Sequence, residues 1–283
     1  MNKKEIRKLI KRALKEDIGK GDITSETILP LNLNTRAFII SKEKGIICGL
    51  EIAEMVFKSV EKKIIFKKLV KEGEEVEVKE KVAEIIGPAR KILSAERTAL
   101  NFLQRLSGIA TLTYEFIKKT KPYKVEILDT RKTTPGLRSL EKYAVRIGGG
   151  KNHRFGLWDR ILIKENHIDL VGLRFAIRKA KKFGKKVEVE VRNLKEIKEA
   201  LEEGADIIML DNMKLKEMKK GVKLIKKRAL IEVSGNVTLK RIKEIARLGV
   251  NWISIGELTH SPKCLDLSLK IERWQGKQEV RKV

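Results

Sequence analysis

The second half of the sequence predicts an α/β fold with a parallel sheet, arranged as an incomplete (β/α) barrel. Short apolar runs alternate there with amphipathic helical stretches, which is typical of buried parallel strands linked by helices. The last four runs begin about 20 residues apart, as consecutive βα units do. The six runs are VEILD (125–129), ILIK (161–164), VEVEV (187–191), IIMLD (207–211), LIEVS (230–234) and WISIG (252–256).

The ends of these runs favour a barrel over a doubly wound sheet, although the alternation itself suits both. In (β/α) barrels the chemistry sits at the carboxyl ends of the strands and in the loops that follow them. Nearly every run ends on a polar or small residue, which predicts a ring with cations on one side and carboxylates on the other. The ring residues are Asp129 with Arg131, Lys164, Glu190, Asp211, Ser234 and Gly256.

The first hundred residues mix helices and strands. The apolar residues between Ile6 and Leu14 share one face of a basic amphipathic helix over 1–19. A surface helix packed on the core is favoured over a targeting or membrane-surface helix, because acidic residues interrupt its charge. The remaining predictions are a loop at 19–30, strands at 35–41, 45–49, 64–70 and 81–93, a helix at 50–60, and a long helix from Ser94 that Gly108 either kinks or marks as the domain boundary.

Length and composition indicate a globular protein. The chain has 283 residues, of which 42% are apolar, and this is enough for two modest domains with a sizeable core. No apolar run reaches the length of a membrane span. The two cysteines, Cys48 and Cys264, have neither CxxC nor metal-ligand spacing, which indicates a reducing compartment and a cytoplasmic protein.

The net charge of +26 suggests nucleic acid as a first class of partner. The lysines, however, are spread over nearly every predicted helix and are interleaved with glutamate. Aromatic residues make up only 5% of the chain, so it has few of the stacking platforms of nucleic-acid binders. We interpret most of the charge as solvated surface, from heat adaptation or an AT-rich genome, and a basic nucleic-acid-binding protein is the alternative from another functional class.

The stretch from Arg131 to Lys164 is cationic in a different way. It contains nine Lys and Arg residues and only two acids. Two cations about 4 Å apart at a partly solvated site repel by roughly 4 kcal/mol, so cations that converge at strand ends require an anion. Arginine offers a planar fork to carboxylate or phosphate, and lysine adds a mobile point charge. The candidates for a small anionic ligand are Arg131, Lys132, His153, Arg154 and Lys164.

Two carboxylates face this stretch in the predicted barrel. Glu190 and Asp211 end neighbouring strands, and paired carboxylates beside a phosphate-bearing ligand suit Mg²⁺ or sugar hydroxyls. Salt bridges to Lys164 or Lys132 are the alternative, and both interpretations can hold when the ligand is absent. A metal triad of the three histidines is not favoured, because no two of them share a helical spacing.

Glycine-containing loops supply the last predicted feature. Ser234, Gly235 and Gly256 follow the final two strands, where barrels often bind phosphate on backbone amides. Two ordinary βα turns are the alternative. The GGG at 148–150 lacks the spacing of a P-loop, so we interpret it as a sharp turn before His153.

Taken together, these motifs resemble the quinolinate phosphoribosyltransferases, the nicotinate-nucleotide pyrophosphorylases of NAD biosynthesis. The resemblance covers most of the chain in the right order, and LDTRKTTPG with GGGKNHR is highly specific. Where the family usually reads SGG or SGN, this chain has Asn236 after Gly235. The matching stretches are EDIGKGDIT, ERTALNFLQRLSGIAT, LDTRKTTPGLR, GGGKNHRFGL, LIKENHI, VEVEV, MLDN, VSGN and ISIGELTHS.

The resemblance implies two domains and a homodimer. Residues 1–108 would form an N-terminal α/β sandwich domain joined by the tail 266–283, and residues 109–265 would form the incomplete α/β barrel. The neighbouring chain would complete each active site through Arg97. Small molecules rather than nucleic acid or membrane are then the expected partners.

The resemblance also implies a role for each candidate residue. Lys132 and Lys164 would lie between quinolinate and phosphoribosyl pyrophosphate, and Glu190 and Asp211 would contact the ribose and Mg²⁺, directly or through water. The implied ligands of the two quinolinate carboxylates are Arg131, His153 and Arg154, and the implied cradle of the 5-phosphate is Ser234, Gly235, Gly256 and His260.

The implied reaction transfers a phosphoribosyl group and removes CO₂. The pyridine nitrogen of quinolinate would attack C1′ of the ribose, and pyrophosphate would leave with help from Mg²⁺ and lysine. Glu190 or Asp211 would stabilise an oxocarbenium-like centre. A related phosphoribosyltransferase with another acceptor, such as nicotinate, is the nearest alternative, although a monocarboxylate would require fewer cations than this stretch supplies.

Overall fold

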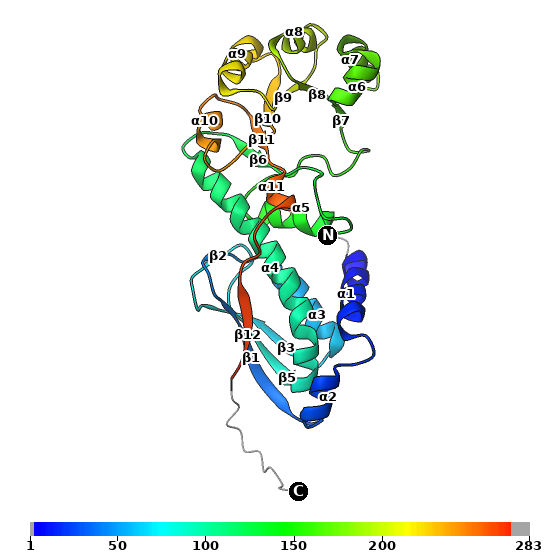
Figure 1. Ribbon diagram of the computed structural model, residues 1–283, viewed down its shortest axis with the longest axis vertical. Helices are drawn as coiled ribbons and strands as arrows, with labels where there is room; N and C mark the ends of the chain where they lie inside the picture. The colour runs from blue at the N-terminus through cyan, green and yellow to red at the C-terminus, as the bar shows by residue number, and fades with distance from the viewer. Residues whose placement is uncertain (1–2, 273–283) are drawn as a thin grey trace. The chain divides into compact units, whose positions relative to one another are not determined.

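The computed structural model describes residues 3–272, and the backbone contacts divide the chain into two units (Figure 1). Unit 1 comprises residues 1–111 and 263–283, and unit 2 comprises residues 112–262. The sequence placed the boundaries after residue 108 and before residue 266. The part of the predicted tail that follows Glu272 lies outside the described residues.

Unit 1 contains a four-stranded antiparallel sheet in the order β12–β1–β5–β3, in which a strand that follows unit 2 in the sequence pairs with strands that precede it. Figure 1 shows β12, in red near the end of the chain, beside β1 in blue. A short antiparallel pair, β2 and β4, lies outside this sheet. The strands are β1 (Asn34–Ser41), β2 (Gly45–Ile46), β3 (Ile65–Lys68), β4 (Glu75–Val76), β5 (Lys81–Pro88) and β12 (Leu267–Glu272).

Two helices at the start of unit 1 show one confirmed prediction and one correction. Helix α1 (Lys3–Ile18) buries Ile6, Ile10 and Leu14 on the predicted apolar face and packs against α3 (Leu50–Val60). The predicted loop at 19–30 contains a short helix, α2 (Ile23–Ile28). Asp22 caps α2 by accepting a hydrogen bond from the backbone N–H of Ser25 at 3.0 Å, which satisfies one of the first free amides.

The long helix α4 (Ala89–Thr120) corrects one further prediction and decides against a break at Gly108. It begins five residues before the predicted Ser94, because strand β5 ends at Pro88 rather than at residue 93. Gly108 does not interrupt it. A Cβ added at Gly108 would lie 2.0 Å from the carbonyl oxygen of Lys263, so glycine is needed where the returning chain passes the helix.

Unit 2 is an incomplete parallel barrel, as predicted. Its six strands are all parallel and follow the order β6–β11–β10–β9–β8–β7, with no pairing between β6 and β7 among the described residues. In an incomplete barrel, strands that are consecutive in the sequence lie side by side and one pair of strands remains unpaired. A doubly wound sheet has a different strand order. The strands are β6 (Glu126–Leu128), β7 (Ile161–Ile163), β8 (Val187–Val191), β9 (Ile207–Asp211), β10 (Leu230–Ser234) and β11 (Trp252–Ser254).

Amphipathic helices follow the strands of unit 2. In α9, for example, Met218, Gly221 and Ile225 are buried while the lysines between them remain outside. Asn193 caps α8 by accepting from the backbone N–H of Glu196 at 2.9 Å. The helices are α5 (Arg138–Ile147), α6 (Glu165–Val171), α7 (Leu173–Lys181), α8 (Leu194–Glu202), α9 (Leu215–Ile225), α10 (Ile242–Ala246) and α11 (Glu257–His260).

The alternation of side chains along the strands positions the site. Successive residues of a strand point to opposite faces, so Glu188 and Glu190 of β8 share one face while the valines between them point the other way. Glu232 and Ser234 of β10 follow the same pattern. Among residues 3–272, no helix is long and apolar enough to cross a membrane.

Candidate active site

A cavity of 760 Å³ lies at the carboxyl ends of the strands of unit 2. Its walls contain all the predicted site residues except Arg97, which is exposed on α4 and belongs to unit 1. This is the end of the sheet at which (β/α) barrels hold their active sites. The predicted residues that line the cavity are Arg131, Lys132, His153, Arg154, Lys164, Glu190, Asp211, Ser234, Gly235, Gly256 and His260.

The arginines of the cavity form a cationic wall. Arg154 is only 6% exposed, and its Nη1 donates to the backbone carbonyl of Arg160 at 3.1 Å. Burial lowers the pKa of Arg154, and the positive charge of Arg131 lowers it further. The charge on Arg154 is thus disfavoured by its surroundings, and an anion in the cavity would stabilise it.

Lys132 is fixed through its backbone. Its N–H donates to Thr130 Oγ1 at 3.0 Å, and its carbonyl accepts from Thr259 Oγ1 at 2.7 Å. A Cβ on Gly256 would lie 3.0 Å from Lys132 Cδ and 3.1 Å from His260 Cδ2. Glycine at position 256 therefore lets these two basic side chains approach the loop after β11 closely.

Glu190 and Asp211 form the acidic side of the cavity. Lys164 Nζ donates to Glu190 Oε2 at 2.8 Å, so the predicted salt bridge is present. Burial raises the pKa of Asp211, and the nearby charge of Glu190 raises it further. This repulsion, together with the oxygen ligands, makes the pair suitable for a hard cation such as Mg²⁺. The backbone N–H of Lys164 donates to His167 Nδ1 at 2.9 Å, which accounts for His167 as a structural residue.

The loop after β10 requires glycine at position 235. Gly235 has a φ of +81°, and a Cβ there would lie 2.2 Å from Asn212 Oδ1. Asn236 also has a positive φ, of +50°, a conformation that asparagine tolerates better than most residues. Its Nδ2 donates to Asn212 Oδ1 at 3.0 Å, so Asn236 ties this loop to the end of β9.

The three glycines at 148–150 form the predicted turn. Gly149 has a φ of +90°, and a Cβ on Gly150 would lie 2.8 Å from Val145 Cγ1 at the end of α5. After this turn the backbone N–H of Lys151 donates to the carbonyl of Ile127 at 2.8 Å. The chain thereby runs beside β6 and brings His153 into the barrel.

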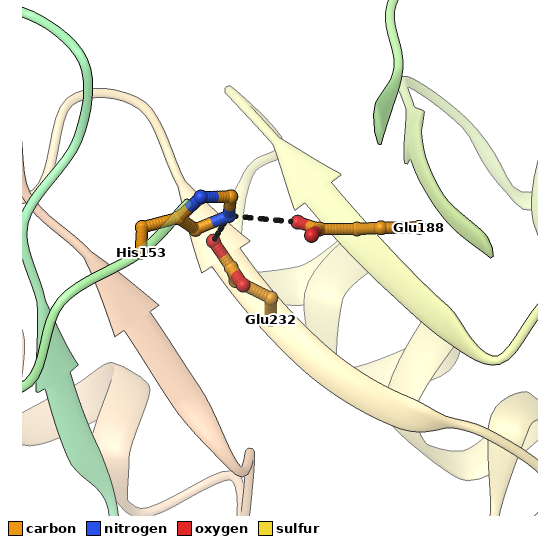
Figure 2. A group of neighbouring side chains, drawn as sticks. All are labelled: His153, Glu188 and Glu232. Atoms are coloured by element: carbon orange, nitrogen blue, oxygen red, sulfur yellow. Dashed lines mark hydrogen bonds and ion pairs between the residues drawn. The ribbon is translucent and has the colours of Figure 1, made fainter. Parts of the chain in front are cut away.

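His153 lies between two buried carboxylates that sequence reasoning did not select (Figure 2). Its Nε2 is 3.1 Å from Glu188 Oε1 and 3.4 Å from Glu232 Oε1, and Arg160 Nη1 donates to Glu188 Oε2 at 3.2 Å. Burial alone would raise the pKa of Glu188, but His153 and Arg160 outweigh it and lower this pKa. Burial, followed by the charge of Glu188, raises the pKa of Glu232 well above its ordinary value.

A buried ion pair holds the backbone of His153. Asp129 and Lys142 are at most 1% exposed and form a salt bridge. Asp129 Oδ1 accepts from the backbone N–H of His153 at 2.9 Å, and Lys142 Nζ donates to its carbonyl at 3.0 Å. Burial raises the pKa of Asp129 and lowers the pKa of Lys142, because loss of hydration outweighs their mutual attraction.

The histidine and its two carboxylates have the spacing of a metal site, because their ligand atoms lie within 4.8 Å of one another. Hydrogen bonding argues against a metal here. The backbone N–H of Arg154 donates to His153 Nδ1 at 2.7 Å, so that nitrogen must be the acceptor. The ring proton then lies on Nε2, which has no lone pair for a metal. The group is a hydrogen-bonded cluster.

Comparison with known proteins agrees with this arrangement. The family model for the N-terminal domain of quinolinate phosphoribosyl transferase matches residues 22–107, and the model for its C-terminal domain matches residues 109–270. The chain belongs to the quinolinate phosphoribosyltransferase family. A probable nicotinate-nucleotide pyrophosphorylase (carboxylating) of Methanocaldococcus jannaschii is 48% identical over 280 residues, which cover 95% of this chain and 98% of that protein.

Two further members of the quinolinate phosphoribosyltransferase family are similar to this protein over nearly the whole chain. The probable carboxylating pyrophosphorylase of Bacillus subtilis is 42% identical, over 96% of this chain and 95% of that protein. The solved nicotinate-nucleotide pyrophosphorylase of Francisella tularensis is 43% identical with a TM-score of 0.91, and covers 96% of this chain and 98% of that one. The family prediction and the α/β fold class are thereby confirmed.

A solved structure with low sequence identity shares the fold of this protein. Human nicotinic acid phosphoribosyltransferase has a TM-score of 0.63 at 12% identity, covering 88% of this chain and 72% of that one. The architecture is therefore shared with an enzyme whose name gives a different pyridine acid. The fold therefore does not determine which pyridine acid accepts the phosphoribosyl group, and the side chains in the cavity must do so.

Proposed function

We infer that this protein is a quinolinate phosphoribosyltransferase. It transfers the phosphoribosyl group of phosphoribosyl pyrophosphate to quinolinate and releases pyrophosphate and CO₂, and its product is nicotinate mononucleotide. The observation that carries this conclusion is one cavity that unites a cationic wall, an acidic pair and two glycine-containing loops in a chain of this family. The relatives named above as carboxylating pyrophosphorylases support it.

The proposed binding mode uses the two sides of the cavity for the two substrates. Arg131 and Arg154 would bind the quinolinate carboxylates, which is supported by the lowered pKa of the buried Arg154. Lys132 and Lys164 would lie between quinolinate and the pyrophosphate. The 5-phosphate would lie against the loops after β10 and β11, whose residues for this role are Ser234, Gly235, Gly256 and His260.

In the proposed reaction, the pyridine nitrogen forms a bond to C1′ as the bond from C1′ to pyrophosphate breaks. The ammonium groups of Lys132 and Lys164 would stabilise the charge that develops on pyrophosphate, and Glu190 or Asp211 would stabilise the cationic ribose centre. Mg²⁺ held by Glu190 and Asp211, directly or through water, would neutralise phosphate charge. The carboxylate at C2 then leaves as CO₂, its bonding electrons are stabilised by the pyridinium, and C2 takes a proton from solvent.

The assembly and location of the protein belong to the same proposal. A homodimer in which Arg97 completes the site of the neighbouring chain is supported by the exposure of Arg97 on α4. A cytoplasmic location is supported by only two cysteines, of which Cys48 is buried and Cys264 is exposed.

Turnover of labelled quinolinate tests the function directly. The protein, phosphoribosyl pyrophosphate and Mg²⁺ should release labelled CO₂ from the 2-carboxylate and form an equal amount of nicotinate mononucleotide. Nicotinate should be a poor acceptor in the same assay, because it offers one carboxylate to a wall that fits two. Folded protein that turns over nicotinate and leaves quinolinate unchanged would exclude the proposal and favour the alternative acceptor.

A further inference from the structure

His153 lines the active-site cavity, yet the protein engages every polar atom that it has. Its backbone N–H donates to Asp129 Oδ1 at 2.9 Å, and its carbonyl accepts from Lys142 Nζ at 3.0 Å. Its Nδ1 accepts from the backbone N–H of Arg154 at 2.7 Å, and its Nε2 faces Glu188 Oε1 at 3.1 Å. The residue therefore has no polar atom left to offer to a ligand.

The donor at each contact fixes the form of the ring. A backbone N–H can only donate, so Nδ1 of His153 must accept and carries no proton. Nε2 then carries the ring proton and donates a hydrogen bond to the carboxylate of Glu188, along the contact that Figure 2 marks with a dashed line. His153 is thereby held as a neutral imidazole in one tautomer. An imidazole in this form cannot also donate from Nδ1 to a substrate carboxylate.

These contacts belong to a closed ring of hydrogen bonds that passes through Arg154. From His153 Nε2 the ring continues through the carboxylate of Glu188 to Arg160 Nη1, which lies 3.2 Å from Glu188 Oε2. It returns through the carbonyl of Arg160, which accepts from Arg154 Nη1 at 3.1 Å. It closes where the backbone N–H of Arg154 meets His153 Nδ1. Both ends of Arg154 are therefore fixed.

We propose that His153 is a positioning residue, which holds Arg154 in its binding geometry through this ring and makes no polar contact with the substrate. The inference rests on the proposed function, since it assigns carboxylate recognition to Arg154 in place of His153. A preformed guanidinium pays no ordering cost when the ligand arrives, so the ring should act on quinolinate binding more than on phosphoribosyl pyrophosphate binding.

Nitrogen NMR of the unaltered protein tests the ring form without any assay of turnover. The chain has three histidines, so ¹⁵N-histidine labelling gives three rings, and His153→Asn identifies the relevant one. We expect an unprotonated Nδ1 and a protonated Nε2 near neutral pH, unchanged by saturating quinolinate. Protonation of Nδ1, either before or after quinolinate is added, would overturn the proposal. This result does not depend on whether product forms.

A double-mutant cycle on quinolinate KM separates positioning from direct contact. His153→Ala should raise quinolinate KM on the order of 10–100-fold and leave the KM of phosphoribosyl pyrophosphate nearly unchanged. His153→Asn, which keeps an acceptor for the N–H of Arg154, should recover part of the loss. The double variant His153→Ala with Arg154→Ala should be no worse than Arg154→Ala alone. Additive effects would show that His153 contacts the substrate itself.

The proposed function and this inference fail in different measurements. If the unaltered protein releases no CO₂ from quinolinate, the proposed function fails. The tautomer of His153 in the free protein still decides whether the ring exists as described. If the variants do not fold, the NMR measurement on unaltered protein remains the deciding one.

Discussion

The barrel has two layers of charged residues, which meet on β8 and differ in their environments. We call Lys164, Glu190 and Asp211 the mouth layer, and Glu188 with Glu232 the buried layer. Glu188 and Glu190 are two residues apart on β8 and share one face. The mouth layer lines an open cavity, whereas both side chains of the buried layer are 0% exposed. The same residue type therefore lines the cavity in one layer and is enclosed by its neighbours in the other.

Electrostatics shows what separates the layers. In the mouth layer, Asp211 is raised in pKa by burial and by Glu190, so this layer has negative charge left for a cation or a cationic centre. In the buried layer, Glu188 is balanced by Arg160 and is hydrogen-bonded by His153, while burial and the charge of Glu188 raise the pKa of Glu232 well above its ordinary value. Negative charge is therefore compensated at Glu188 and disfavoured at Glu232, so the buried layer offers little charge to a ligand.

The largest expected effect is at Lys164 of the mouth layer and at Lys132, which lines the same cavity. Lys164→Ala or Lys132→Ala should reduce quinolinate turnover by about 10²–10³-fold or more, because in the proposed reaction each removes a cation that would stabilise the leaving pyrophosphate. The thermal unfolding midpoint should change little, since the ammonium of Lys164 lies in an open cavity. Lys198→Ala, an exposed residue of α8, is the matched control and should retain full activity. Full activity in both lysine variants would disprove their roles.

Substitutions in the buried layer should lower the free energy of unfolding. Glu188→Ala removes the acceptor of the ring Nε2–H of His153 and of the guanidinium of Arg160. Removing one partner of a buried pair costs about 3 kcal/mol or more of unfolding free energy. Denaturant unfolding measures the loss. The control is Asp169→Ala, which removes an exposed pair with Arg192 and should cost less than about 1 kcal/mol. Equal losses in the two variants would show that burial does not distinguish the layers.

The two layers also differ in how far the sequence could predict them. The mouth layer was predicted because strand ends in a barrel meet at one edge, so the position along each run was sufficient. Glu188 and Glu232 were missed because the prediction used only the last residue of each apolar run. The signal was present: a glutamate in the middle of a valine-rich buried strand must either pair or lose its charge. Its partner could not be predicted, because His153 arrives from a loop.

Helix boundaries failed for a local reason. The sequence placed residues 89–93 in a strand, because Ile92 and Leu93 were read as a continuation of the apolar strand, and Pro88, a residue typical of helix starts, was not taken as the boundary. Gly108 was ambiguous for a tertiary reason. Its need for glycine comes from the carbonyl of Lys263, which is 155 positions away in the chain, and no local pattern reports such a contact.

Only the mouth layer is open to a residue from a second chain. If Arg97 completes the neighbouring site, Arg97→Ala and Lys164→Ala should each be inactive alone. After the two are unfolded and refolded together, about a quarter of wild-type activity should return, because half of the dimers are mixed and each has one intact site. Activity is measured as CO₂ release against protein concentration. No recovery, despite mixed dimers detected by two different affinity tags, would assign Arg97 to its own chain's site or to none.

The smallest expected effect belongs to Glu232 and appears only as pH rises. Its pKa in the folded protein lies above the ordinary value of 4.5, so it keeps its proton after the unfolded chain has lost it. Stability from this group is therefore complete below about pH 4.5 and is lost as pH rises toward the folded pKa. Glu232→Gln mimics the neutral acid and removes this dependence. The variant should match the wild type in denaturant unfolding near pH 5 and exceed it at higher pH, by up to about tenfold in the unfolding constant for each pH unit below the folded pKa. A difference that stays constant with pH would mean that Glu232 is ionised in the fold, and that the buried layer carries the same unbalanced charge as the mouth layer above it.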